Sequence, residues 1–177
     1  MAASVRADKL VIKDEQGLPI IPGKTIKGLL RDAAQQLHQL DPERITSTFI
    51  QKVFGAKEGD DAADKAASKY HFTTATLSPK IVDSVRTGKL QSQLYDTYAS
   101  TRIDTHGLAQ DQSLRTIELV VPLVLYGQII GFPADQVRMK QQLKDTMHFV
   151  KRMGTNRHRG LGRCSWTIIN ETEKSAS

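Results

Sequence analysis

The most regular hydrophobic pattern in the chain lies in its first quarter. Apolar residues recur there three and four positions apart, at Ile26, Leu29, Leu30, Ala33, Leu37 and Leu40. This spacing places them on one face of a helix. We expect Thr25 to cap the helix at its N-terminus and Asp41-Pro42 to end it. The two prolines of the preceding stretch LPIIPG predict an extended path into the helix.

Two shorter patterns follow. A weaker helical pattern covers Glu43–Phe54 and ends at Gly55, where the small and charged stretch AKEGDDAADKAASK predicts a loop. Tyr70–Ser78 is rich in β-branched and aromatic residues, which predicts a strand. No secondary structure is predicted for the polar residues 79–112.

The C-terminal part of the chain alternates strand and helix patterns. Residues 113–131 predict one or two strands, Asp135–Met153 returns to helical spacing, and Cys164–Ile169 predicts a last strand. Extended segments, helices and strands in this order predict an α+β fold with helices packed on an antiparallel sheet. We expect a single domain over residues 1–170 and a polar tail at 171–177.

Charge and composition narrow the function classes. The chain has 177 residues and a net charge of +6, which favours an anionic partner such as nucleic acid. Only 6% of the residues are aromatic, so backbone electrostatics is a better basis for nucleic-acid binding than extensive base stacking. One cysteine permits no internal disulfide, and no apolar run approaches the roughly 20 residues of a membrane span. These features indicate a cytoplasmic protein.

The stretch GTNRHRGLGRC combines three glycines and three arginines with no acidic residue. Glycine lets backbone N–H groups approach a phosphate closely, and arginine binds phosphate oxygens in bidentate fashion. The candidate RNA-binding residues here are Gly154, Asn156, Arg157, His158, Arg159, Gly160, Gly162 and Arg163. The alternative is a solvated basic loop whose glycines only end a helix and begin a strand.

A second group of cations lies on the first predicted helix. Lys24, Lys27 and Arg31 are spaced three and four apart and form one stripe near its N-terminal end, with Thr25 in the same turn. The first turn of a helix also offers unpaired N–H groups to an anion. The alternative is that the stripe is only the solvent face of an amphipathic helix.

Four motifs in order resemble the RAMP superfamily, the repeat-associated proteins of CRISPR systems. They are GLPIIPGKTIKGLLR, then VFG followed by YHFTTATLS, then RIDTHGLAQDQSLRTIELVVP, and last RHRGLGRC. The third and fourth motifs are most similar to the backbone subunit of type III effector complexes.

This resemblance implies a modified ferredoxin-like, RRM-like antiparallel sheet with helices on one face. It implies a subunit that binds CRISPR RNA through the first helix and the glycine-rich loop, and that assembles with copies or paralogues of itself and other effector subunits. It also implies a thumb-like hairpin, placed within residues 95–113, that inserts into the duplex of guide and target RNA. Arg102, Asp104 and His106 belong to this hairpin.

The resemblance further implies a catalytic role for Asp8 in RADKLVIKD. In catalytic relatives an aspartate at this place supports cleavage of the target RNA with Mg²⁺ or another divalent cation, and metal positioning is the role we expect, since a lone carboxylate is a weak base. Relatives begin with a strand ahead of this aspartate. That strand is missing here, so we expect either a shortened N-terminus or a strand supplied by another chain.

Three functions stay open from the sequence. The first is an RNA-guided endoribonuclease subunit that uses Asp8. The second is a non-catalytic structural or capping subunit that only binds CRISPR RNA. The third is the endonuclease that processes the CRISPR transcript, with His106 or His158 as general base.

Overall fold

The computed structural model describes residues 10–55, 68–101, 108, 113–133 and 135–169. The chain forms two compact units. Unit 1 comprises Met1–Ile21 and Thr74–Gly127, and unit 2 comprises Pro22–Thr73 and Gln128–Ser177. The single domain expected over residues 1–170 stays a prediction, and the tail at 171–177 lies outside the described residues.

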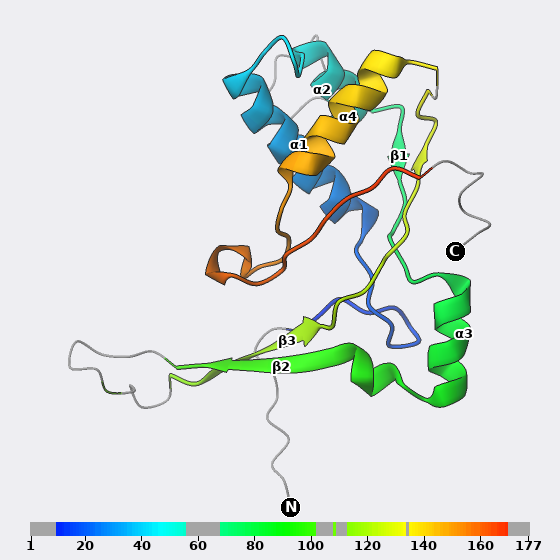
Figure 1. Ribbon diagram of the computed structural model, residues 1–177, viewed down its shortest axis with the longest axis vertical. Helices are drawn as coiled ribbons and strands as arrows, with labels where there is room; N and C mark the ends of the chain where they lie inside the picture. Colours follow the sequence, from blue (N-terminus) through cyan, green and yellow to red (C-terminus); the bar gives the residue numbers. More distant parts are fainter. Residues whose placement is uncertain (1–9, 56–67, 102–107, 109–112, 134, 170–177) are drawn as a thin grey trace, which may run out of the picture. The chain divides into compact units, whose positions relative to one another are not determined.

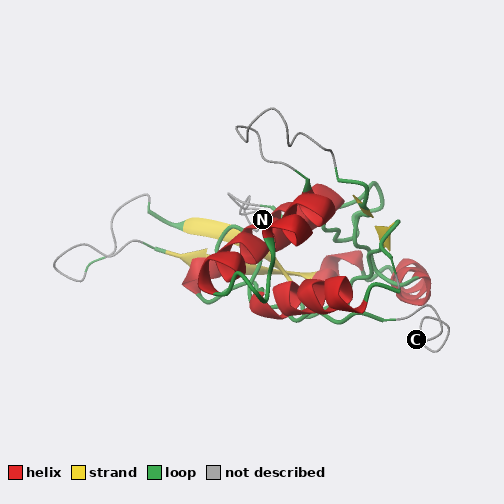
Figure 2. Cartoon of the chain, turned by 90° about the horizontal axis from the view of Figure 1, so that it is seen from above, coloured by secondary structure: helices red, strands yellow, loops and turns green. Residues whose placement is uncertain are grey.

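Unit 2 is built around the long helix α1 (Gly23–Leu40), shown in blue in Figure 1. This helix contacts α2 (Ser47–Phe54), β1 (His71–Phe72) and α4 (Val137–Phe149). The strand β1 pairs antiparallel with β4 (Ile129–Ile130). Helices therefore dominate the regular structure of this unit, and its strands are short (Figure 2).

The core of unit 2 confirms the apolar face predicted for α1 except at its last position, because Leu40 is 75% exposed. Ile26, Leu30 and Ala33 are buried, and Phe54 of α2 stacks on Phe72 of β1 with ring centroids 5.9 Å apart. The other buried apolar residues of this unit are Ala34, Ile45, Phe49, Ile50, Val53, Met139, Leu143 and Val150. Among the described residues, no helix is long and apolar enough to cross a membrane.

The start of α1 differs from the prediction. The helix begins at Gly23, directly after Pro22, and Thr25 therefore lies inside the first turn and does not cap it. The N–H groups of Thr25 and Ile26 both donate to the carbonyl of Pro22, at 2.9 and 3.1 Å. The earlier start is possible because proline cannot donate a hydrogen bond and needs no partner at a helix entrance. The predicted end is confirmed, with Asp41 as the C-cap.

The second and fourth helices are shorter than their patterns suggested. The helix α2 begins at Ser47, because Thr46 caps it by accepting the N–H of Phe49 at 3.2 Å, and residues 41–45 form a turn. Arg44 ties this turn to α4 through an ion pair with Asp145 at 2.9 Å. The hydrogen bond from Arg44 holds the pKa of the Asp145 carboxyl below its usual value.

Unit 1 is organised around the turn Asp14–Leu18. The Oδ1 atom of Asp14 accepts the N–H groups of Gln16 and Leu18, both at 2.9 Å. Leu18 enters a core that it shares with Leu77, Val85 and Leu94. The turn thereby joins α3 (Pro79–Gly88), η2 (Gln91–Leu94) and the antiparallel pair of β2 (Tyr95–Ser100) with β3 (Arg115–Val120).

The α+β class is confirmed. Among the described residues the strands form two separate two-stranded sheets, β1–β4 and β2–β3. The predicted strand Tyr70–Ser78 is reduced to His71–Phe72 in β1, and Ala75 and Thr76 make only isolated bridges, to Ile21 and Tyr126. Residues 1–9 fall outside the described residues, so the expectation of a shortened N-terminus or of a first strand supplied by another chain stays a prediction.

The polar residues 79–112, for which the sequence predicted no secondary structure, contain the helix α3 and the start of a hairpin. Ser78 caps α3 by accepting the N–H of Ile81, and Pro79 occupies its first turn. A serine before a proline is a regular helix-start signal that the weak periodicity of the segment obscured. The strands β2 and β3 pair in antiparallel register from Tyr95↔Val120 to Ser100↔Arg115, so the hairpin extends beyond the predicted range 95–113.

The predicted last strand is wrong over the described residues. Cys164–Ile169 has no strand assignment, and the nearest pairing is the single bridge between Arg152 and Arg163. The alternating pattern of this segment reflects half-buried Trp166 and Ile168 rather than pairing within a sheet.

We expect replacement of Gly23 by alanine to destabilise the chain. A Cβ atom at Gly23 would overlap the carbonyl oxygen of Phe72, so α1 and β1 would have to separate. Overpacking of this kind costs about 1–3 kcal/mol. Denaturant unfolding of the purified chain measures the change.

Gly28→Ala is the matched control in the same helix. Its Cβ would meet no atom within 4 Å, so we expect unchanged or slightly greater stability from the better helix propensity of alanine. Equal stability of the two variants would contradict the packing described for α1.

Candidate nucleic-acid interface

The glycine-rich stretch forms a closed loop in unit 2. Arg152 and Arg163 form an isolated antiparallel bridge at its base. Two backbone hydrogen bonds flank this bridge, from the N–H of Met153 to the carbonyl of Gly162 at 2.8 Å and from the N–H of Cys164 to the carbonyl of Lys151 at 2.9 Å. Figure 1 shows the loop, in orange, after the C-terminal end of α4. Its two ends are thus fixed to each other.

Gly162 is required by this closure. Its φ of 69° lies in the left-handed region, and a Cβ atom there would overlap the carbonyl oxygen of Met153. Gly160 also has a positive φ, 83°, where it ends the short helix η3 (Arg157–Arg159), but a Cβ atom there would meet nothing within 4 Å. Gly162 therefore permits a close approach of two backbones, whereas Gly160 only permits a turn.

The bridge brings two like charges together. The flanking hydrogen bonds make Arg152 and Arg163 a non-hydrogen-bonded pair, the type in which opposite side chains come closest. Both side chains are exposed. Like charges directly opposite each other are destabilising, so this pair favours an anion that both guanidinium groups can bind.

The rest of the loop adds exposed positive charge. Lys151, Arg157, His158 and Arg159 are exposed, and none of the loop cations makes an ion pair with the described residues. The Nη1 atom of Arg152 donates to the carbonyl of Arg157 at 3.3 Å, which holds one guanidinium group over the loop. Asn156 precedes η3 and is half-buried. The loop is therefore a concentrated cationic surface.

The cations of α1 have different surroundings. Lys24 and Thr25 are exposed. Burial and then the charge of Arg31 lower the pKa of Lys27. Arg31 points into the protein, where its Nη2 atom donates to the carbonyl of Gly55 at 2.9 Å and its buried Nε atom has no hydrogen-bond partner among the described residues. Lys24 and Lys27 are thus available to an anion, whereas Arg31 also caps the end of α2.

The remaining predicted site residues lie outside the described residues. These are Asp8 and the hairpin residues Arg102, Asp104 and His106. Among the residues that the structure describes, no three His, Cys, Asp or Glu side chains cluster as a metal site would require. The divalent cation stays a prediction.

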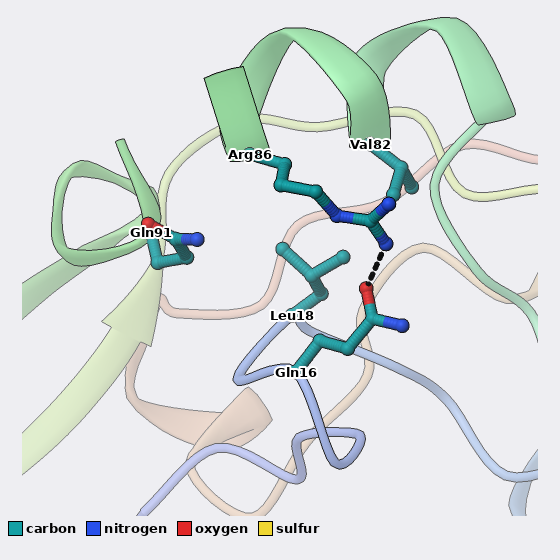
Figure 3. Close-up of a pocket in the computed structure, with 5 residues that line it drawn as sticks. All are labelled: Gln16, Leu18, Val82, Arg86 and Gln91. Carbon is teal, nitrogen blue, oxygen red and sulfur yellow. Dashed lines mark hydrogen bonds between the residues drawn. The ribbon is translucent and has the colours of Figure 1, made fainter. Parts of the chain in front are cut away.

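Unit 1 contains a small open hollow lined by Gln16, Leu18, Val82, Arg86 and Gln91 (Figure 3). Arg86 spans it, because its Nη2 atom donates to Oε1 of Gln16 at 2.7 Å. This hydrogen bond ties α3 to the turn Asp14–Leu18 and uses polar groups of two of the lining side chains. We therefore assign no ligand to the hollow.

Arg152 is the residue that reasoning from the sequence missed. It precedes the glycine-rich stretch and counts toward its positive charge, but only the backbone bridge reveals that it faces Arg163. The two cationic groups, on α1 and in the loop, belong to the same compact unit. One unit thus presents both.

Comparison with known proteins gives one family. The model of the RAMP superfamily matches residues 2–165. A chain in the cryo-EM structure of the Type III-B Cmr-beta complex bound to cognate target RNA is similar at 14% identity and a TM-score of 0.49, over 67% of this chain and 73% of that chain. A chain in the cryo-EM structure of the apo state of Type III-B Cmr-beta is similar at 13% identity and a TM-score of 0.47, over 71% of this chain and 75% of that chain. Likeness at this level supports no conclusion about function. No curated protein sequence matches.

We expect Gly162→Ala to open the loop and Gly160→Ala to leave it closed. Both glycines have a positive φ, so alanine at either position costs about 1 kcal/mol in backbone strain. Only Gly162→Ala also drives a Cβ atom into the backbone of Met153. Amide hydrogen exchange of Met153 and Cys164 measures closure, since both N–H groups bond across the base of the loop. Equal protection of these two amides in both variants would contradict the assigned closure.

Proposed function

The chain belongs to the RAMP superfamily, and from this premise we propose that it is an RNA-binding subunit of a type III CRISPR effector complex. It holds the CRISPR RNA by its sugar–phosphate backbone, and base pairing of that RNA supplies the specificity for the target. Its partners are CRISPR RNA, complementary target RNA, and other effector subunits that include copies or paralogues of itself. It acts in the cytoplasm.

The observation that carries the proposal is the closed cationic loop. Its ends are joined at Arg152 and Arg163, and this places two exposed guanidinium groups opposite each other. A phosphate bound by both groups removes their repulsion and gains charge-assisted hydrogen bonds. Residues 151–163 contain no acidic side chain that could do the same within the loop.

The loop chemistry favours RNA backbone over base edges. Phosphate contacts position a nucleic acid and carry no sequence information, whereas bases are read by hydrogen bonds to their edges or by stacking on rings. Residues 151–163 contain no Phe, Tyr or Trp on which a base could stack. A subunit that must hold guides of many sequences needs this kind of contact. Lys24 and Lys27 of α1 add positive charge to the same unit, and Thr25 lies in the same turn.

Cleavage of the target is the second part of the proposal. Asp8 supports cleavage of the target RNA with Mg²⁺ or another divalent cation, which would supply charge stabilisation at the scissile phosphate when bound. RNA carries its own nucleophile in the 2′-hydroxyl: its attack on the adjoining phosphate forms a 2′,3′-cyclic phosphate and releases the 5′-hydroxyl of the next nucleotide. The protein therefore needs to position the reacting groups more than to supply new ones.

We expect Arg152→Ala and Arg163→Ala each to weaken binding of single-stranded RNA by about tenfold, because a charge-assisted contact is lost. The loss should be equal across RNA sequences. The slope of log affinity against log salt should fall by about 0.7 for each phosphate contact removed. Lys27→Ala and Arg159→Ala should act in the same direction, and filter binding at several salt concentrations measures all four.

Lys80→Ala is the control, since Lys80 is an exposed cation in α3 of unit 1. It changes the net charge equally and should leave the affinity almost unchanged. If all the substitutions, including Lys80→Ala, lowered the RNA affinity equally, the loop would contribute only through the net charge of the chain. Sequence-dependent losses would contradict the backbone-binding role.

For cleavage, we expect Asp8→Ala to abolish cutting of a complementary RNA by the guide-loaded complex, with a loss of about 100-fold or more. Guide RNA should still co-purify with the complex. Glu15→Ala removes an exposed acidic residue seven positions later in the chain and should leave cleavage intact. Chelation of divalent cations should mimic Asp8→Ala. Undiminished cleavage in the Asp8 variant would leave this chain as a non-catalytic scaffold.

A further inference from the structure

Lys27 of α1 lies between the buried face of the helix and its solvent face. The residue is half-buried, whereas Lys24, one turn earlier, is exposed. Its neighbours in the chain are Ile26, which is buried, and Gly28. A Cβ atom at Gly28 would meet no atom within 4 Å, so the helix surface beside Lys27 is open to a small molecule.

Arg31 is held one turn after Lys27. Residues four positions apart are neighbours on the surface of a helix. The Nη2 atom of Arg31 donates to the carbonyl of Gly55 at 2.9 Å, and its Nε atom is buried. These contacts keep the guanidinium group in place, and arginine does not lose its charge in proteins. A fixed positive charge therefore acts on the amine of Lys27.

No carboxylate offsets the repulsion between these two side chains. The one acidic residue of α1 is Asp32, which follows Lys27 by five positions and lies on a different side of the helix. Neither Lys27 nor Arg31 makes an ion pair with any residue that the structure describes. Like charges four positions apart destabilise a helix, so a change that neutralises Lys27 relieves this repulsion.

These surroundings favour the unprotonated amine of Lys27. Burial, and then the charge of Arg31, lower the pKa of Lys27. A lower pKa leaves more of the amine unprotonated near neutral pH, and only the unprotonated amine can attack a carbonyl carbon. Desolvation and a neighbouring cation are the two effects that make lysine a nucleophile in proteins. Lys27 combines both with an open helix surface.

The positive charge around Lys27 favours one class of reagent. An acyl phosphate carries its acyl group on a phosphate, and phosphate is attracted to the charges of Lys24 and Arg31. The charge of Arg31 also stabilises the negative charge that develops on phosphate as it leaves. The group that keeps the amine unprotonated thus assists departure of the leaving group.

We propose that Lys27 is a modification site that acyl phosphates acetylate directly. The Nζ lone pair attacks the carbonyl carbon of acetyl phosphate and forms a C–N bond. The bond between that carbon and the phosphate oxygen breaks, inorganic phosphate leaves with the electron pair, and Nζ gives one proton to water. The product is a neutral amide. Its effect on RNA affinity rests on the proposed function, because the modification removes a charge from the surface that binds RNA.

The first test compares acetylation rates along the chain. The purified protein is treated with acetyl phosphate near neutral pH, and mass spectrometry of its peptides follows each lysine. We expect Lys27 to react several times faster than Lys24 and Lys80, although both of these are more exposed. A rate at Lys27 equal to or below theirs would overturn the proposal.

The second test assigns the effect to the charge of Arg31. Arg31→Gln removes the charge and keeps an N–H that can donate to the carbonyl of Gly55. Acetylation of Lys27 should become slower, and the pH at which its rate levels off should rise, because a group that lowers its pKa is gone. Arg31→Lys keeps a positive charge and should react nearly as wild type does. Equal slowing in both variants would mean that Arg31 acts only through structure, and would overturn its role.

The third test measures the consequence for RNA binding. After treatment the wild-type chain should bind single-stranded RNA about tenfold more weakly, since one charge-assisted contact is lost. Lys27→Arg keeps the charge, lacks the amine, and should retain its affinity after the same treatment. An equal loss in treated Lys27→Arg would place the effect at other lysines and overturn the regulatory role.

An untreated chain that does not bind RNA would instead contradict the proposed function. The acetylation rates at Lys27 would still test the modification site in that case, because they need no RNA. The two failures are therefore distinguishable.

Discussion

One electrostatic constraint dominates the glycine-rich loop: Arg152 pairs with Arg163 at its base. Two backbone hydrogen bonds hold these like charges opposite each other, and Gly162 permits the approach because it lacks a Cβ atom. A closed loop with this arrangement is less stable alone than with a bound anion. The loop would therefore gain stability from an anion that both guanidinium groups bind.

The two units are stabilised in different ways. In unit 2, packing of α1 against α2, α4 and β1 supports the cationic loop and the lysines of α1. In unit 1 the core is smaller, and polar contacts at Lys13, Tyr95 and Glu118 add to the pairing of the β2–β3 hairpin.

Local patterns predicted the helices better than the strands. The apolar face of α1 and its end at Asp41 follow from spacing and from a proline, and both are confirmed. The start at Gly23 was missed because the nearby Thr25 suggested a cap. Pairing partners such as Arg152 and Arg163, or Lys13 and Glu118, lie 11 and 105 residues apart, and no local pattern reports such contacts. Arg31 was predicted to bind RNA because of its place in the cationic stripe, and the structure shows that it also caps the end of α2.

The most direct measurement is a structure of the guide-loaded complex at a resolution that shows side chains. We expect a phosphate of the guide within hydrogen-bonding distance of both the Arg152 and the Arg163 guanidinium groups, with the loop closed as it is here. Arginines that instead pair with carboxylates of a neighbouring subunit, with the guide bound elsewhere on the chain, would show that the loop does not hold the guide.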